Sequence, residues 1–215
     1  MKKQLIKIIT VLVASYTLTA CSPFFHEPTF NGTILDVETK QPIEGAVVMA
    51  VYYKRSMGMG AGQYSSIINI RETLTNKDGT FLIPSYTTLL FLPFTWQDRP
   101  MFLLYKPGYA SLEWPLKSNF TGEETTNREM SPWLDPLLRN KYKVILRVPG
   151  IVEIPKLKTK DERRSSMPSH PDELGHFKEQ MILIQLINEE RKYLGEEELD
   201  PYKLRDFILN MGKGH

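Results

Sequence analysis

The segment 45–53 constrains the fold more than any other part of the chain, because it is apolar at both alternating positions (Gly-Ala-Val-Val-Met-Ala-Val-Tyr-Tyr). Successive side chains of a β-strand point to opposite faces of its sheet, so both faces of this predicted strand must be covered. An opposing sheet can cover one face. We therefore expect a second layer over the other face, formed by a different part of the molecule.

The sequence around this segment predicts further strands, because runs rich in β-branched and aromatic residues lie between turn residues. Asn-Lys-Asp-Gly at 76–79 predicts a hairpin turn, since Asp-Gly supplies the positive φ that a tight turn needs. The middle of the chain is thus predicted to be β. The other expected strands are 30–37, 65–75, 80–84, 101–105 and 142–148.

Four motifs in these strands and turns resemble the carboxypeptidase regulatory-like domain. The resemblance implies a mainly β fold, a Greek-key β-sandwich of the transthyretin (prealbumin) type. The motifs are Gly-Thr-Ile-Leu-Asp at 32–36, Pro-Ile-Glu-Gly-Ala-Val-Val at 42–48, Thr-Leu-Thr-Asn-Lys-Asp-Gly-Thr-Phe-Leu-Ile-Pro at 73–84 and Lys-Pro-Gly-Tyr at 106–109.

The C-terminal quarter predicts an α-helical hairpin instead of strands. Apolar residues recur at helical spacing over 172–194, and Gly195 follows as a C-cap. Asp-Pro at 200–201 opens a second, shorter apolar helix. We expect the hairpin to pack on the outer face of the strand 46–53, and docking on a partner protein is the alternative.

The N-terminus has the pattern of a secretory signal. Lys2, Lys3 and Lys7 precede the uncharged, mostly apolar stretch 8–20. This stretch is shorter than the roughly 20 residues that span a bilayer, but it suits the apolar region of a signal peptide. It ends in Leu-Thr-Ala-Cys, with the chain's only cysteine, Cys21, at the last position.

This tetrapeptide resembles the lipobox of bacterial lipoproteins. The resemblance implies that the Cys21 thiol receives a diacylglycerol, that the chain is cut before it, and that the new amine is acylated. The alternative is an ordinary secretory signal with a coincidental cysteine. In certain bacterial groups an Asp after the cysteine marks inner-membrane retention, so Ser22 favours the outer membrane, facing the periplasm.

Charge gives no sign of a nucleic-acid partner. The full chain carries a formal charge of +2, with 27 basic and 25 acidic residues. Removing residues 1–20 takes away three lysines and no acidic residue, which leaves a net charge of −1. A dedicated nucleic-acid binder would carry a basic surface, so we predict none.

These observations divide the chain into five parts. We expect a lipoprotein signal peptide at 1–20, a tether at 21–28 and the sandwich at 29–150. A basic, non-periodic stretch containing Pro155 is predicted to be a linker at 151–171, and the helical appendage covers 172–215.

No catalytic or metal site can be assembled from the sequence. His176 and Glu179 match the His-x-x-Glu spacing of metallocarboxypeptidase zinc ligands, but the large catalytic domain of those enzymes is absent, so we interpret the match as coincidence. His170 and His176 with Asp172 and Glu173 form another candidate metal site, for which a solvated helix start is the preferred interpretation. We predict no enzyme, no metal and no cofactor.

The apolar stretch 89–96 (Leu-Leu-Phe-Leu-Pro-Phe-Thr-Trp) is the candidate binding segment, with Phe91, Phe94 and Trp96 as its binding residues. Its proline disfavours a central strand, so one interpretation is a loop that binds a partner or leans on a membrane. The alternative is that it covers one end of the sandwich.

The function expected is that of a lipid-anchored, non-catalytic binding or scaffolding module of the bacterial cell envelope. Its partners would be the membrane, through Cys21, and an envelope protein. One alternative is a carbohydrate-recognition module, which needs two of Trp96, Trp114 and Trp133 exposed on one face. Another is a small envelope enzyme, which needs His170 or His176 in a pocket beside a carboxylate.

Overall fold

The computed structural model describes most of the chain between residues 24 and 200, and its fold is mainly β, with several sheets and a smaller share of helix. The predicted signal peptide, Cys21, Phe91, Phe94 and the second C-terminal helix lie outside the described residues. The ranges described are 24–58, 62–90, 95–114, 118–121, 128–147, 150–168 and 176–200.

The first layer is an antiparallel sheet built around the long strand β3, and we call it the β3 sheet. Its strand order is β4-β3-β8-β9, and β7 pairs with the far half of β3. The strands are β3 (Val47–Gly58), β4 (Gly62–Leu74), β7 (Thr95–Gln97), β8 (Met101–Tyr105) and β9 (Leu112–Trp114).

The second layer, which we call the β2 sheet, has the order β10-β11-β12-β2-β5, with β12 parallel to β2 and the other pairs antiparallel. Beyond Phe30 and Ile83 the pairing continues as the two-stranded ribbon β1–β6. The strands are β1 (Phe24–Glu27), β2 (Phe30–Asp36), β5 (Thr80–Ile83), β6 (Tyr86–Leu89), β10 (Arg128–Glu129), β11 (Ile145–Arg147) and β12 (Ile151–Ile154).

The two sheets share one apolar core. Phe30 of the β2 sheet meets Phe102 of the β3 sheet edge to face, with ring centroids 4.9 Å apart. Phe102 also contacts Trp114 and Phe120, at centroid distances of 5.9 and 4.8 Å. Buried aromatic pairs of this kind stabilise the core beyond the area that they bury.

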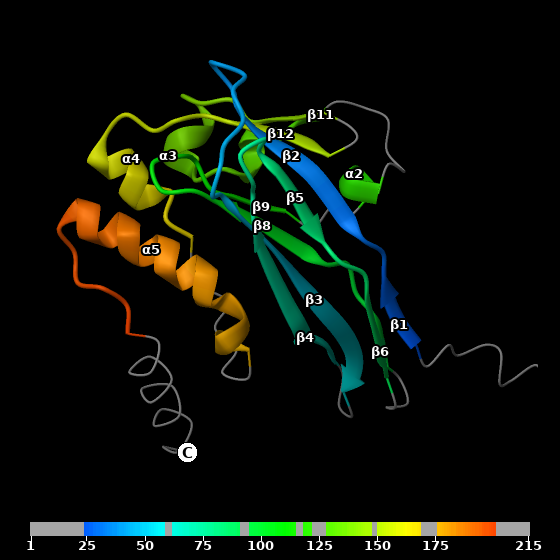
Figure 1. The fold of residues 1–215 in the computed structure, drawn as a ribbon. Helices are drawn as coiled ribbons and strands as arrows, with labels where there is room; N and C mark the ends of the chain where they lie inside the picture. The colour runs from blue at the N-terminus through cyan, green and yellow to red at the C-terminus, as the bar shows by residue number, and fades with distance from the viewer. Residues whose placement is uncertain are drawn as a thin grey trace, which may run out of the picture.

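The opposite face of the β3 sheet is covered by a helix, as the two apolar faces of segment 45–53 predict (Figure 1). Val47, Met49 and Val51 pack here against α5 (Met181–Leu194), which follows the short 3-10 turn η2 (Phe177–Gln180). The expected docking of the first C-terminal helix on this strand is therefore confirmed. The rest of the predicted hairpin lies outside the described residues.

Shorter helices gather at the end of the molecule away from the ends of β1 and β6 (Figure 1). Two of them begin at side-chain caps: Asp135 accepts from Leu137 N, and Thr159 forms a capping box with Glu162. Both caps satisfy amide groups that the first turn leaves without partners. The elements are α2 (Ser118–Thr121), η1 (Ser131–Trp133), α3 (Pro136–Arg139) and α4 (Lys160–Ser165).

Two segments expected to lie outside the sandwich belong to it. The predicted tether 21–28 contains strand β1, and the predicted linker 151–171 contains strand β12 and helix α4. The linker prediction failed because it rested on a basic, non-periodic sequence and on Pro155, which in the structure lies just after β12. Within β12 the carboxylate of Glu153 is buried. In the fold Lys40 and Arg147 pair with this buried carboxylate, each at 2.8 Å, and burial becomes tolerable.

A tight turn forms at 76–79 as predicted, but it does not close a hairpin, because β4 pairs with β3 and β5 pairs with β2 in the other sheet. Gly79 has φ +70°, and the side-chain oxygen of Asn76 accepts from the backbone N–H groups of Asp78 and Thr80. Gly195 caps α5 with φ +81°. Within the part of the chain that the structure describes, no helix has the length and apolarity needed to cross a bilayer.

Candidate interaction surface

Exposed apolar side chains surround one end of the sandwich. In the two-stranded ribbon, Phe24 at the start of β1 is paired with Leu89 at the end of β6. In the β3 sheet, Met57 and Tyr64 lie near the turn between β3 and β4, and Trp96 pairs with Arg55. We call this set the apolar end; its exposed fractions are Phe24 59%, Met57 56%, Tyr64 57%, Leu89 42% and Trp96 36%.

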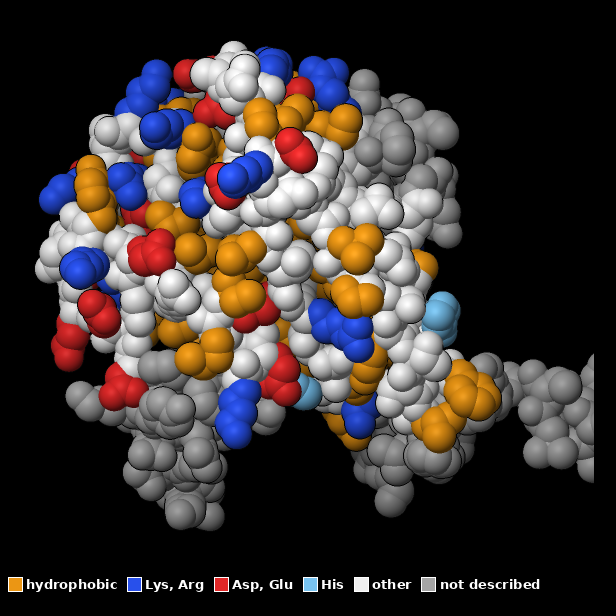
Figure 2. Space-filling view, in the orientation of Figure 1, with side chains coloured by type: hydrophobic (Ala, Val, Ile, Leu, Met, Phe, Trp, Pro, Cys, Tyr) orange, Lys and Arg blue, Asp and Glu red, His pale blue; other side chains and the backbone are white. Residues whose placement is uncertain are grey.

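Hydrogen bonds hold the two halves of the apolar end together. The Gln97 side chain of β7 donates to the backbone carbonyl of His26 in β1 at 3.2 Å, and it also contacts Glu27. The ends of β1, β6, β3 and β4 consequently lie at the same end of the molecule (Figure 1). Figure 2 shows hydrophobic side chains over the ends of β1 and β6.

A polar layer begins at the level of Trp96, further from the tip of β3 than Met57 and Tyr64. Arg55 pairs with Asp98 at 2.8 Å, and the Ser65 hydroxyl donates to the same carboxylate at 3.1 Å. Burial alone would raise the pKa of Asp98, but hydrogen bonds from the Arg99 amide, Ser65 and Arg55 hold it below its usual range. Lys54 adds a second cation at the next position of β3. Charged and apolar side chains therefore lie close together at this end of the sandwich, with Trp96 level with Arg55.

Of the sequence-predicted binding residues, only Trp96 lies within the described chain. Leu89 belongs to the predicted binding segment 89–96, although it was not named as a binding residue. Phe24, Met57 and Tyr64 were missed, because they lie at strand ends far apart in the chain. One signal was available: Phe24 is a large apolar residue within the predicted tether 21–28, where a core residue is not expected.

The three tryptophans do not form one surface. Trp114 is fully buried against Phe102 and Phe120, so a platform that includes it is wrong. Trp133 is exposed, but it belongs to η1, which lies beside β9, whereas Trp96 pairs with the far end of β3. The structure therefore gives no support to a sugar-stacking face made by two exposed tryptophans.

The histidines in the described chain are also separate. His26 bonds Thr87 on the outside of the ribbon at 2.7 Å, and His176 lies just before η2 with its Nδ1 buried. Among the described residues no three His, Cys, Asp or Glu side chains come close enough to hold a metal ion. His170, Asp172 and Glu173 lie outside the described residues.

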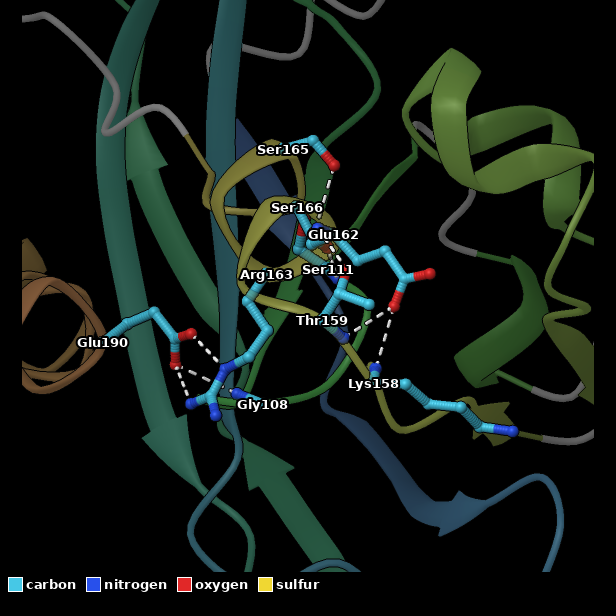
Figure 3. A network of polar contacts seen from close by, with 9 residues as sticks. All are labelled: Gly108, Ser111, Lys158, Thr159, Glu162, Arg163, Ser165, Ser166 and Glu190. Carbon is cyan, nitrogen blue, oxygen red and sulfur yellow. Dashed lines mark hydrogen bonds and ion pairs between the residues drawn. The ribbon is translucent and has the colours of Figure 1, made fainter. Parts of the chain in front are cut away.

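Two carboxylates, the buried Glu190 and the half-buried Glu72, contact α5 or its neighbours. At its C-terminal half, Glu190 accepts from Arg163 of α4 at 2.7 Å and from the backbone N–H of Gly108 at 3.0 Å (Figure 3). The Arg163 guanidinium also lies 3.7 Å from the ring centre of Tyr193, and its hydrogen bond with Glu190 raises its pKa. Glu190 is 1% exposed, so the pair is a structural tie between α4, α5 and the β8–β9 turn.

The second carboxylate, Glu72 of β4, lies at the helix start. It accepts from the backbone N–H groups of Ile182 and Leu183, at 2.6 and 3.0 Å. These amides have no partner within the helix, and the positive end of the helix dipole favours an anion beside them. Burial raises the pKa of Glu72, although the two backbone donors act in the opposite direction.

An open groove of about 540 Å³ runs along the solvent side of α5. The chain turns back beside it after Gly195, where Asn188 exchanges two hydrogen bonds with the backbone of Leu199. Met181 and Ile184 supply apolar surface, and Lys192 and Glu198 supply charge. The next residues of the chain lie outside the described range.

Comparison of the chain with protein-family models, with curated proteins and with solved structures gave no match.

Proposed function

We propose that this protein is a lipid-anchored, non-catalytic module of the bacterial cell envelope that binds or scaffolds another envelope component. One observation carries the proposal: Cys21 precedes Phe24, the first described residue of β1, by three positions. The anchor and the apolar end therefore belong to the same end of the sandwich, which presents the rest of the molecule away from the attachment point.

The fold proposed is the transthyretin-type Greek-key sandwich of the carboxypeptidase regulatory-like domain. The motifs that carry this resemblance fall on β2, on the start of β3, on the turn before β5, and on the β8–β9 turn. Gly79 and Gly108, the glycines of the last two motifs, have φ of +70° and +82°. Glycine occupies such positions at low cost, which supports the motif assignment.

A binding role is consistent with the structural roles of three carboxylates that the fold covers partly or fully. Glu190, Glu72 and Glu153 each contact backbone donors or cations that fix elements of the fold. Each has a structural explanation. An envelope module of this kind would act through its surface and its position at the membrane.

The anchor is tested with Cys21→Ser. The parent protein should incorporate labelled palmitate and fractionate with membranes, whereas Cys21→Ser should remain an unlabelled precursor or be mislocalised. Ser22→Ala is the matched control and should be labelled like the parent. Processing and membrane fractionation of Cys21→Ser at the parental level would contradict the proposal.

Membrane choice and partner binding need separate measurements. Ser22→Asp should shift the protein from outer-membrane to inner-membrane fractions if the host follows that sorting rule. Crosslinking in intact cells, followed by purification of the protein, should recover a defined envelope partner with the parent and less of it with Cys21→Ser. Recovery of the same partner in equal amount from both would show that binding does not depend on the anchor.

A further inference from the structure

We infer that the apolar end docks on the surface of the same bilayer that holds the lipid, so that the sandwich stands end-on instead of swinging on a tether. This inference rests on the proposed attachment at Cys21. The docking surface consists of Phe24, Met57, Tyr64, Leu89 and Trp96, and its occupant is a phospholipid surface.

The covalent geometry limits how far this end can lie from the membrane. Only Ser22 and Pro23 separate Cys21 from Phe24, and a fully extended chain covers about 11 Å over these three residue steps. Acyl chains buried in the hydrocarbon keep the cysteine at headgroup level, in a region roughly 5–7 Å thick on each side of the bilayer. Phe24 must therefore lie in or beside the interfacial region.

The side chains present at this end suit that region. Phe24, Tyr64 and Trp96 are aromatic, and aromatic rings, Trp and Tyr above all, are enriched at membrane–water interfaces. The large apolar residues exposed elsewhere in the described chain are Leu74, Leu82, Trp133, Leu137, Met181 and Tyr193, on helices and single strands. At the apolar end, five such residues come from both layers and surround the tip of the sandwich.

The polar layer lies at a suitable depth for the headgroups. Lys54 and Arg55 precede the end of β3 by three or four residues, which is roughly 10–13 Å along a strand. With the tip in the interface, both cations would face lipid phosphates, and Arg55 keeps an exposed side chain despite its pairing with Asp98.

The anchor also favours the bilayer over other occupants. A tether this short holds the lipid surface against the apolar end at a high effective concentration, whereas a second copy or another protein must arrive by diffusion. Even weak apolar contacts can then keep the end docked most of the time.

The chain's single cysteine allows a direct test. Residues 21–215, which contain every described element, would be coupled through Cys21 to a maleimide-bearing lipid in phosphatidylethanolamine–phosphatidylglycerol vesicles. The Trp133→Phe variant leaves Trp96 as the exposed tryptophan, since Trp114 is buried. Its fluorescence should shift to the blue and be quenched by bromine-labelled lipid when the protein is coupled. The matched Trp96→Phe variant, which keeps Trp133, should show neither change.

A second pair of variants separates docking from mere proximity. Phe24→Ser combined with Met57→Ser, in the Trp133→Phe background, should lose most of the bromolipid quenching. Both side chains are exposed, so the fold should survive. Leu137→Ser, an exposed leucine on α3, should keep the quenching.

Three results would overturn the inference: no quenching of Trp96 in coupled protein, equal quenching of Trp96 and Trp133, or protection of Trp96 from acrylamide without any effect of bromolipid. The last result would indicate a second copy as the occupant. Because coupling is chemical, this experiment does not depend on lipidation in the cell. Absence of docking in the coupled vesicles would not change the interpretation of the Cys21→Ser experiment. Absence of lipidation in cells would likewise leave the vesicle measurement interpretable.

Discussion

The two faces of the β3 sheet are covered in different ways. One face packs on the β2 sheet through an apolar core of aromatic and aliphatic side chains. The other face carries the helix α5, with apolar residues in the middle, the half-buried Glu72 at its start and the buried Glu190 toward its end. Both layers cover the same strand, β3, so the contrast lies in how each is positioned.

The difference has a physical reason. Many pairings and connections fix the β2 sheet relative to the β3 sheet, whereas a lone helix on an apolar surface can slide or rotate at little cost. Hydrogen bonds are directional, and a buried carboxylate without its donors is expensive. Polar contacts at both ends therefore fix the position of α5, while apolar contacts supply most of its attraction to the sheet.

The largest effect should come from the core between the sheets. Phe102→Ala removes a fully buried ring that contacts Phe30, Trp114 and Phe120, and it should lower the free energy of unfolding by about 3–5 kcal/mol. Urea denaturation measures the loss. Leu137→Ala, at a position 77% exposed, is the control and should change stability by less than about 0.5 kcal/mol.

The next largest effect should come from the tie between α4 and α5. Glu190→Ala leaves the Arg163 guanidinium and the Gly108 N–H without their buried acceptor. Breaking a buried pair typically costs about 3–5 kcal/mol, and because Arg163 keeps some contact with water we expect about 2–4 kcal/mol.

A double variant tests whether this cost belongs to the unpaired charge. Arg163→Met with Glu190→Leu should be more stable than Glu190→Ala, because no charge is then left without a partner. If the stability losses of the two single variants add up to that of the double variant, the pair acts only through packing. Polar contacts would then not explain how α5 is positioned on the β3 sheet.

Local patterns predicted the elements on both faces of β3, but not the ties between them. Segment 45–53 is apolar on both sides, which implied a second covering layer, and the helical spacing of apolar residues over 172–194 predicted the helix that forms it. The strand β12 was missed because its stretch is basic and non-periodic and contains Pro155; that Lys40 and Arg147 pair with Glu153 is known only once the chain has folded. The Arg163–Glu190 pair was missed for the same reason.

The candidate surface shows the same limit. Trp96 and Trp114 look alike in the sequence, yet one is exposed beside Arg55 and the other is fully buried beside Phe102. Which neighbour each tryptophan meets depends on strand order. The apolar end joins five residues spread over more than seventy positions, and no local periodicity relates them.

A smaller effect is expected at the turn where the chain passes from one sheet to the other. Gly79 links β4 to β5 with φ +70°, and a Cβ there would lie 2.5 Å from the Ile34 carbonyl oxygen. Gly79→Val should destabilise the protein by about 1–3 kcal/mol, since a β-branched residue is strained at positive φ. Thermal melting measures the effect.

Gly195 provides the control for that turn. It has a similar φ of +81°, but no atom lies within 4 Å of a Cβ placed there. Gly195→Ala should cost about 1 kcal/mol from backbone strain alone. Equal losses at the two glycines would mean that the close contact with Ile34 relaxes and that the crossing between the sheets is not tightly packed.

The smallest effect should be a change in pH dependence at the start of α5. Burial raises the pKa of Glu72 above its ordinary value of 4.5, so the folded protein holds this proton more tightly than the unfolded chain does. The stabilisation that this provides is complete below pH 4.5 and is lost as the pH rises through the folded-state pKa.

Glu72→Gln cannot titrate. The stability of the parent relative to Glu72→Gln should therefore fall between about pH 4 and the folded-state pKa, and then stay constant. Urea denaturation of both proteins from pH 4 to pH 8 measures this difference, and groups common to both cancel. At pH 7 the two should differ by only about 1 kcal/mol, because the amide oxygen still accepts from the helix start. A relative stability that rises with pH would mean that the two helix amides outweigh burial, and the N-terminal contact of α5 would then be a favourable charge interaction instead of a positional one.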